Sequence, residues 1–306
     1  MTVAGARPSF ALEAAPTAWL FPGQGAEAGG RLRSGPGRAT RLLERAGRAL
    51  ELDLVAAVDR GDPRLARTAV AQPTLVALCV GIAQDLEAAG EVAHAVAGHS
   101  LGELSAMAAA GCLAAEDAVD LAVERGRLMA EAARESPGGM VALRASDRGE
   151  IERLLALARA SGRIAVAARN SPTQWVLSGD RRAIGAVAAA TPVTVLPTGG
   201  AWHSEAMAEA ETRWLAVLRG ATFRPPRCRL ILNRHGRALE VGDDPAALLA
   251  GQLTRPVEWW GSIEALARLG VARWRAIGPG QALRALCREI LGDAVDVTLA
   301  AGGRPS

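Results

Sequence analysis

The sequence predicts an α/β fold, in which a large domain built on a parallel sheet carries a smaller inserted domain. Up to Pro137, short apolar runs alternate with stretches of helical apolar spacing, an order typical of parallel sheets. Residues 138–200 then follow a β-α-β-β-α-β order, which is the ferredoxin-like order. The chain has 306 residues, 50% of them hydrophobic, which suffices for both domains. We expect these domains at 1–137 plus 201–306 and at 138–200.

The first part of the large domain is predicted from its apolar spacing. In order, we expect a strand at 19–22, helices at 41–58 and 72–86, a strand at 92–97, and helices at 101–110 and 115–134. Pro73 fits the first turn of the second helix, because proline lacks the N–H that a helix start leaves unbonded.

The small domain begins where Pro137 is followed by two glycines. Within it we expect strands at 140–143, 164–168, 174–178 and 193–197, and helices at 147–160 and 180–190. Asn170, Ser171 and Pro172 predict the turn between the two middle strands. After residue 200 we expect a helix at 204–218, a strand at 229–233, two further helices and a strand at 274–277.

Composition excludes several classes of function. The net charge is +3, all 35 basic residues are Arg, and 3% of residues are aromatic. That charge is too small and dispersed, and aromatic residues are too few, to predict a nucleic-acid partner. No apolar run reaches the roughly 18 residues of a membrane helix, and the N-terminal segment, with Pro8, Glu13 and Pro16, differs from a signal peptide. The four cysteines form no CxxC pair, which predicts neither a metal site nor a disulfide framework. We therefore expect a cytoplasmic protein without a membrane partner.

One pentapeptide carries chemistry. Gly98-His99-Ser100-Leu101-Gly102 matches G-x-S-x-G, and it stands between a predicted strand and an Ala-rich predicted helix. In that context the serine occupies a strained turn that exposes its hydroxyl above the sheet, as in α/β-hydrolase-like domains. The next N–H, that of Leu101, begins a helix and points at a developing oxyanion. The pattern predicts a nucleophilic serine.

A nucleophilic serine needs a base, and the chain has four histidines to supply it. His99 adjoins the serine, so its side chain should diverge from the hydroxyl. His94 opens a predicted strand, and His235 lies in a polar turn. His203 follows the small domain directly and precedes a helix, which makes it the best candidate by placement.

A series of motifs in a fixed order resembles a known family. The motifs are FPGQG at 21–25, QP at 72–73, GHSLGE at 98–103, RG at 125–126, GGM at 138–140, NSP with a following Gln at 170–174, AWHS at 201–204, QL at 252–253, PVEW at 256–259 and GPG at 278–280. With these motifs the chain resembles the acyl-CoA:acyl-carrier-protein acyltransferases, namely the malonyl transacylases of fatty acid synthesis and the acyltransferase domains of polyketide synthases. The motifs are collinear over nearly the whole chain.

The resemblance implies a role for each of these site residues. Ser100 would take the acyl group as an ester, and His203 would serve as its base and acid, oriented by a backbone carbonyl instead of an Asp. Gln24 and Leu101 would supply the N–H groups of the oxyanion hole. Arg125, 25 residues after the serine, would hold the free carboxylate of a malonyl group in two parallel hydrogen bonds.

Three further residues are implied in substrate binding, and one family position differs. Gln252 and Asn170 match family residues near the active site. At Trp202 the family carries Phe in malonyl enzymes and Ser in methylmalonyl enzymes, and the larger indole should crowd any α-substituent. After FPGQG the family continues with Ser-Gln, whereas this chain has Ala26-Glu27.

The function implied is malonyl transfer from coenzyme A to the phosphopantetheine thiol of an acidic acyl carrier protein, by a ping-pong route in fatty acid or polyketide biosynthesis. The acyl-CoA is then a substrate, no cofactor or metal is held, and a free-standing monomer is expected. A thioesterase or editing hydrolase would share Ser100 and His203. A trans-acting acyltransferase for a non-malonyl group would fit the same motifs. A non-catalytic docking subunit would not need them, and the intact set of site residues argues against it.

Overall fold

The computed structural model describes residues 15–25, 37–293 and 295–300. The N-terminal segment and the departure at Ala26-Glu27 lie outside these residues. The large sheet has the strand order β10-β9-β1-β2-β7-β8. Its strands are β1 (Thr17–Phe21), β2 (Ala95–Gly98), β7 (Arg229–Leu232), β8 (Arg237–Ala238), β9 (Arg273–Ile277) and β10 (Val297–Ala300). All neighbours are parallel except β8, which pairs antiparallel with β7. The predicted α/β class with a parallel sheet is confirmed.

The register of the two central strands places the loops that matter for function. β1 and β2 pair from Ala18 opposite Ala95 to Phe21 opposite Gly98, so both strands end at the same edge. Both are almost wholly buried, as strands in a parallel sheet covered by helices must be. The loop after β1 and the turn after β2 therefore emerge side by side, at the carboxyl edge where such sheets bind ligands.

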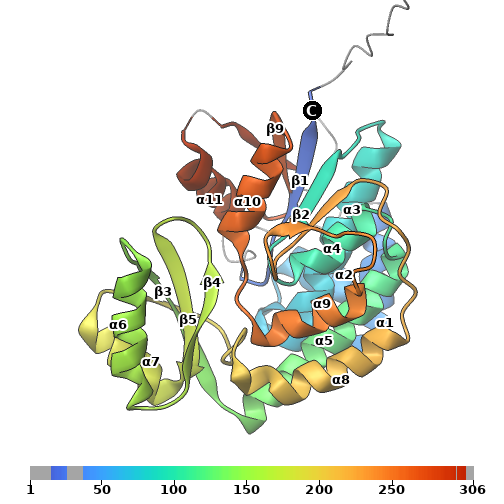
Figure 1. The fold of residues 1–306 in the computed structure, drawn as a ribbon. Helices are drawn as coiled ribbons and strands as arrows, with labels where there is room; N and C mark the ends of the chain where they lie inside the picture. The colour runs from blue at the N-terminus through green and yellow to red at the C-terminus, as the bar shows by residue number, and fades with distance from the viewer. Residues whose placement is uncertain (1–14, 26–36, 294, 301–306) are drawn as a thin grey trace, which may run out of the picture.

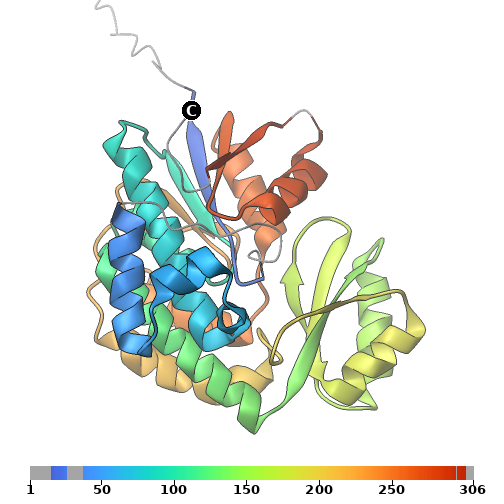
Figure 2. The same cartoon turned by 180° about the vertical axis from the view of Figure 1, so that it is seen from behind.

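Helices surround this sheet (Figures 1 and 2). They are α1 (Arg38–Leu50), α2 (Leu54–Arg60), α3 (Thr68–Ala88), α4 (Gly102–Ala109), α5 (Ala115–Glu135), α8 (Ala208–Arg219), α9 (Pro245–Gly251), α10 (Trp259–Arg268) and α11 (Gln281–Leu291), with short 3-10 turns at Pro63–Ala66, Glu205–Met207 and Gln252–Thr254. Among the described helices, α3 alone is long and apolar enough to cross a membrane, and 72% of its apolar window is buried inside the protein. α3 packs against α1 and α5, as a core helix does.

Several predicted elements differ from the structure for local reasons. The helix expected at 41–58 is two helices, because Glu51 adopts a left-handed conformation (φ 51°) and Asp53 caps α2 by accepting from the Ala56 N–H. α3 begins at Thr68, four residues earlier than expected, so Pro73 lies inside the helix and not in its first turn. β8, α11 and β10 were not predicted at all.

The second sheet belongs to a small subdomain, which we define as residues 138–196. Its order is β4-β5-β3-β6 and all its pairs are antiparallel. The elements follow one another as β3 (Gly138–Arg144), α6 (Arg148–Arg159), β4 (Ile164–Arg169), β5 (Gln174–Asp180), α7 (Arg181–Ala190) and β6 (Thr194–Leu196). This is the predicted ferredoxin-like arrangement, with its own core between the sheet and its two helices. The small subdomain stands beside the large one in both views (Figures 1 and 2).

Candidate active site

Ser100 lies on the sharp turn between β2 and α4. Its φ of 50° is left-handed, a conformation that costs a non-glycine residue free energy. Both flanking residues must be glycine, because neighbouring backbone atoms occupy the space that a Cβ would need. A Cβ on Gly98 would lie 2.0 Å from the Gly102 carbonyl carbon, and one on Gly102 would lie 2.3 Å from the Phe21 carbonyl oxygen. The G-x-S-x-G spacing therefore lets the first turn of α4 pack directly on β1 and β2.

His203 is the histidine that meets the serine. Its Nε2 lies 2.7 Å from Ser100 Oγ, and its Nδ1 lies 2.8 Å from the backbone oxygen of Gln252. That carbonyl can only accept, so Nδ1 carries the proton and Nε2 is free to take one from the hydroxyl. Burial, helped by the positive charge of Arg125, lowers the pKa of His203 to about 3. The imidazole is therefore neutral at pH 7 and can act as a base.

The other histidines do not reach the serine hydroxyl. His94 is exposed, and its Nδ1 accepts from the Thr17 N–H at 3.1 Å. His235 is exposed in its turn. The ring of His99 contacts Asn170 and Trp259 instead, with Nε2 2.9 Å from Asn170 Oδ1 and a distance of 5.4 Å between the His99 and Trp259 ring centroids.

Arg125 reaches the serine from α5. Its side chain is buried, at 3% exposure, and its guanidinium donates to Gln72 Oε1 and Gln252 Oε1 (2.9 Å each) and to Ser100 Oγ (3.2 Å). Burial lowers its pKa to about 10, so it remains charged at pH 7. No carboxylate of the described residues lies within ion-pair distance of it. A buried cation held by neutral amides beside a hydroxyl is a site prepared for an anion.

Gln252 connects most of these groups. Besides its bonds to His203 and Arg125, its amide nitrogen donates to the Ser100 backbone oxygen at 3.1 Å. The same nitrogen donates to the carboxylate of Glu103 in α4. One side chain thus sets the relative positions of the serine turn and the guanidinium.

Glu103, Asn233 and Gln72 were not predicted as site residues. Asn233, at the end of β7, accepts from the Ser100 N–H at 2.5 Å and donates to the Gly98 carbonyl at 2.6 Å. Its own N–H donates to Glu103, whose pKa burial raises to about 8. Glu103 and Gln72 belong to the GHSLGE and QP motifs. A polar residue within an apolar helical stretch was the signal available for both.

Gln24 and Leu101 offer two unused N–H groups at the sheet edge. Leu101 immediately precedes α4, and Gln24 lies in the loop after β1. Neither N–H donates a hydrogen bond within the described part of the chain. The Gln24 side chain donates to Thr68 Oγ1 at 3.0 Å, which ties the loop to α3. Such N–H groups can stabilise an oxyanion.

Asn170 and Trp202 lie at the margin of this cluster. Asn170 Oδ1 is 2.9 Å from His99 Nε2, so Asn170 contacts the neighbour of the serine and not the serine itself. Trp202 is buried beside His203, and the far edge of its ring packs against Gly200, where a Cβ would lie 2.6 Å from it. No group of three His, Cys, Asp or Glu side chains in the described residues could hold a metal ion.

The sequence of this chain is similar to a family model and to proteins of known activity. A family model described as an acyl transferase domain matches residues 18–256. The malonyl CoA-acyl carrier protein transacylase of Escherichia coli K12 is 32% identical over 285 residues, which cover 90% of this chain and 92% of that protein. The polyketide biosynthesis protein ThaF of Burkholderia thailandensis is 35% identical over 283 residues, which cover 90% of this chain and 24% of ThaF. This chain therefore spans about a quarter of ThaF's length.

A solved structure shares the fold. It is described as a type II polyketide synthase acyl-carrier protein in complex with its malonyl-transacylase. It matches with a TM-score of 0.82 and 28% identity, covering 94% of this chain and 95% of that one.

Proposed function

Because the chain belongs to the acyl transferase family, we propose that it moves a malonyl group from coenzyme A to the phosphopantetheine thiol of an acyl carrier protein. The named activity of the Escherichia coli relative and the carrier-protein complex of a structural neighbour support this. The similarity to ThaF adds polyketide biosynthesis to fatty acid biosynthesis as a context. The coenzyme A thioester is then a substrate, and no step needs a bound cofactor.

The first half-reaction would load the serine. His203 Nε2 takes the proton of Ser100 Oγ as the oxygen attacks the thioester carbonyl carbon. The negative charge that forms on the carbonyl oxygen would be stabilised by the N–H groups of Gln24 and Leu101. The tetrahedral intermediate then expels the thiolate of coenzyme A, and the proton on His203 passes to that sulfur. The product is a seryl ester.

The second half-reaction would run the same steps toward the carrier. The neutral His203 takes the proton of the phosphopantetheine thiol, and the thiolate attacks the ester carbonyl. Collapse of the second intermediate returns the proton to Ser100 Oγ. The backbone carbonyl of Gln252 keeps the imidazole in the tautomer that both steps need.

The observation that carries the malonyl assignment is the buried guanidinium of Arg125. It lies 3.2 Å from the nucleophilic oxygen and has no carboxylate within ion-pair distance in the described residues. A carboxylate separated from the ester carbonyl by one methylene, as in a malonyl group, would supply that charge in a two-pronged contact. Trp202, beside His203, would narrow the space for an α-substituent. Asn170 would act through His99, and Gln252 through both His203 and Arg125.

Three accompanying expectations remain predictions. They are the domain limits 1–137 plus 201–306 and 138–200, a monomeric state, and a cytoplasmic location.

Intact-protein mass spectrometry tests the proposal. The purified chain incubated with malonyl-CoA should gain one malonyl mass and then lose it on addition of a carrier protein with its phosphopantetheine thiol. Ser100→Ala should gain nothing. Ser161→Ala, at an exposed turn of the small subdomain, should label like the wild type. Labelling of Ser100→Ala, or release of the label to water as fast as to the carrier, would contradict a transferase that uses this serine.

A further inference from the structure

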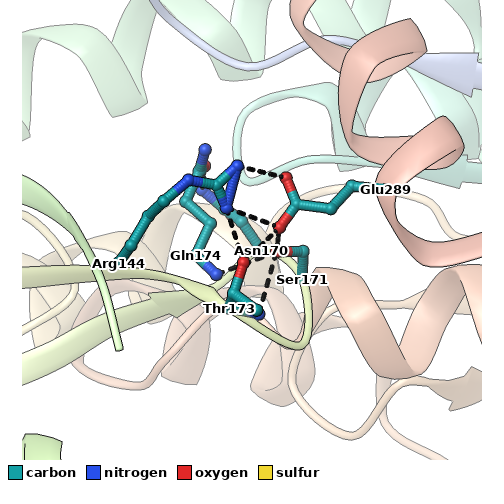
Figure 3. A network of polar contacts seen from close by, with 6 residues as sticks. All are labelled: Arg144, Asn170, Ser171, Thr173, Gln174 and Glu289. Atoms are coloured by element: carbon teal, nitrogen blue, oxygen red, sulfur yellow. Dashed lines mark hydrogen bonds and ion pairs between the residues drawn. The ribbon is translucent and has the colours of Figure 1, made fainter. Parts of the chain in front are cut away.

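The turn between β4 and β5 joins the small subdomain to α11 of the large domain (Figure 3). Glu289 of α11 is the residue on which the contacts of this junction converge. Its Oε1 accepts from Ser171 Oγ at 2.5 Å and from Thr173 Oγ1 at 2.6 Å. Arg144 of β3 donates to both carboxylate oxygens, at 2.9 and 3.1 Å. These donors hold the pKa of Glu289 below its usual value, so the carboxylate stays ionised.

The turn itself is closed by internal hydrogen bonds. The buried Ser171 hydroxyl accepts from the Gln174 N–H at 2.8 Å. The Asn170 N–H donates to the Gln174 carbonyl at 3.0 Å, and the Asn170 side-chain amide donates to Gln174 Oε1 at 2.9 Å. Fixing Ser171 and Thr173 on Glu289 therefore fixes Asn170 as well.

The fixed Asn170 side chain in turn holds the ring of His99. With its Nδ2 donating to Gln174, its Oδ1 faces His99 Nε2 at 2.9 Å, and that nitrogen must carry the proton. Burial lowers the pKa of His99, so the ring is neutral and this tautomer is the one held.

His99 in turn packs against the loop after β1. A Cβ on Gly23 would lie 2.7 Å from the His99 carbonyl oxygen and 3.2 Å from its Nδ1, so only glycine allows this approach. Gln24, whose N–H we assign to the oxyanion hole in the proposed function, is the next residue. The contacts thus run without a gap from α11, through the small subdomain, to the loop after β1 that contains Gln24.

We propose that Glu289 is a positioning residue of the acyl transfer, which holds the β4–β5 turn so that Asn170 and His99 support the Gly23–Gln24 segment. The inference rests on the proposed function and adds to it a residue outside the family motifs of this chain. Its action is separate from that of Arg125, which contacts Ser100 Oγ directly. Loss of Glu289 should therefore lower the rate of acylation by the same factor for malonyl-CoA and acetyl-CoA, with KM little changed.

The subdomains stay joined without Glu289. Val257 donates to the Ala167 carbonyl and accepts from the Arg169 N–H, at 2.9 Å each, and Arg169 pairs with Glu258. A Glu289 variant should therefore keep its fold, and the change should be confined to the turn.

Single-turnover acylation rates test the proposal. Glu289→Ala should slow acylation about 10- to 100-fold, the range seen when a remote change displaces reacting groups. Glu289→Gln should fall between it and the wild type, because its amide oxygen can still accept from the two hydroxyls while its NH₂ faces Arg144. The control is Asp243→Ala, which removes a comparable carboxylate–Arg pair on the segment after β8 and should change nothing.

Two measurements decide how Glu289 acts. In the double variant Glu289→Ala/Asn170→Ala, the rate should equal that of Asn170→Ala alone, and additive losses would overturn the proposal. Side-chain ¹⁵N spectra should show the Nε2–H tautomer of His99 in the wild type and a mixture in Glu289→Ala. An unchanged tautomer would also overturn it. A wild type that accepts no acyl-CoA would refute the proposed function. The spectra need no turnover, so they would still test the role of Glu289 in that case.

Discussion

Two glutamates support the serine turn through different partners, and they differ in exposure and in ionisation. Glu103 is 2% exposed, and its carboxylate accepts from the Asn233 N–H and the Gln252 amide, both neutral. Glu289 has a side chain 24% exposed, and it is bonded directly to Arg144 and two hydroxyls. Burial raises the pKa of Glu103 to about 8, whereas hydrogen bonds lower that of Glu289.

The difference shows that the serine turn is held in two different ways. On the large-domain side, the neutral donors of Asn233 and Gln252 surround the Glu103 carboxyl, whose pKa of about 8 lies near neutral pH. Arg125 is the nearby positive charge. On the small-subdomain side, a partly exposed, ionised carboxylate fixes the β4–β5 turn, and water can replace part of the contacts that its loss removes. Loss of stability should dominate on the first side, and loss of rate on the second.

The largest effect is expected for Glu103→Ala. It leaves two buried donors, the Asn233 N–H and the Gln252 amide, without acceptors, each at a cost of about 1–3 kcal/mol. Glu289→Ala should cost about 1 kcal/mol or less, as for other partly exposed ion pairs. Urea unfolding of both variants measures the contrast. Equal losses of stability would remove the distinction between the two sides.

Arg125→Ala should lower the acylation rate with malonyl-CoA much more than the rate with acetyl-CoA. Without the guanidinium, the malonyl carboxylate enters a buried site unpaired, at a cost of about 2–5 kcal/mol in acylation. Acetyl-CoA carries no such group and should lose little. Lys at this position should recover only part of the malonyl rate, because an ammonium lacks the two-pronged geometry. Acylation rates with both thioesters provide the measurement, and matching losses would make Arg125 a structural residue.

The two asparagines form a matched pair for comparing the sides. Asn233 bonds to the Ser100 N–H directly, whereas Asn170 acts one residue away, through His99. Asn233→Ala should lower stability by about 1–3 kcal/mol, because it leaves the Ser100 N–H without its acceptor. Asn170→Ala should lower the acylation rate with a smaller change in stability. Thermal unfolding together with single-turnover rates separates the two, and the reverse order would contradict the assignment of sides.

The smallest effect is a pH dependence of stability. Between about pH 6.5 and 8 the folded state keeps a proton on Glu103 that the unfolded chain has lost, so the free energy of unfolding should fall as pH rises. His203 contributes with the opposite sign, but only below its ordinary pKa of 6.5. Urea unfolding across this window should show the decline in the wild type and in Glu289→Gln. Glu103→Gln should be flatter, and an equal slope there would place the proton elsewhere.

The sequence predicted the residues that local motifs contain. Ser100 stands in a turn whose glycines are demanded by neighbouring atoms, and its placement between strand and helix was visible from apolar spacing. His203 was favoured by placement, and the structure brings it to the serine. The two-sheet architecture followed from the order of elements.

The supporting residues could not be predicted, because their partners are remote in sequence. Asn233 meets Ser100 across 133 positions and Glu289 meets Ser171 across 118, and no local periodicity records such pairs. The break at Glu51 depends on a left-handed residue that apolar spacing does not reveal. α11 was missed together with the residue that now connects the two subdomains.

The left-handed conformations of Ser100 and His203 have a consequence for protein engineering. Both residues occupy a region that L side chains rarely adopt, with φ of 50° and 58°, and glycine would occupy it without strain. Backbone strain alone would therefore favour glycine at the two positions that we propose as nucleophile and base. A stabilised library of this chain should be screened for turnover from the first round, because its most durable members and its most active members are expected to diverge here.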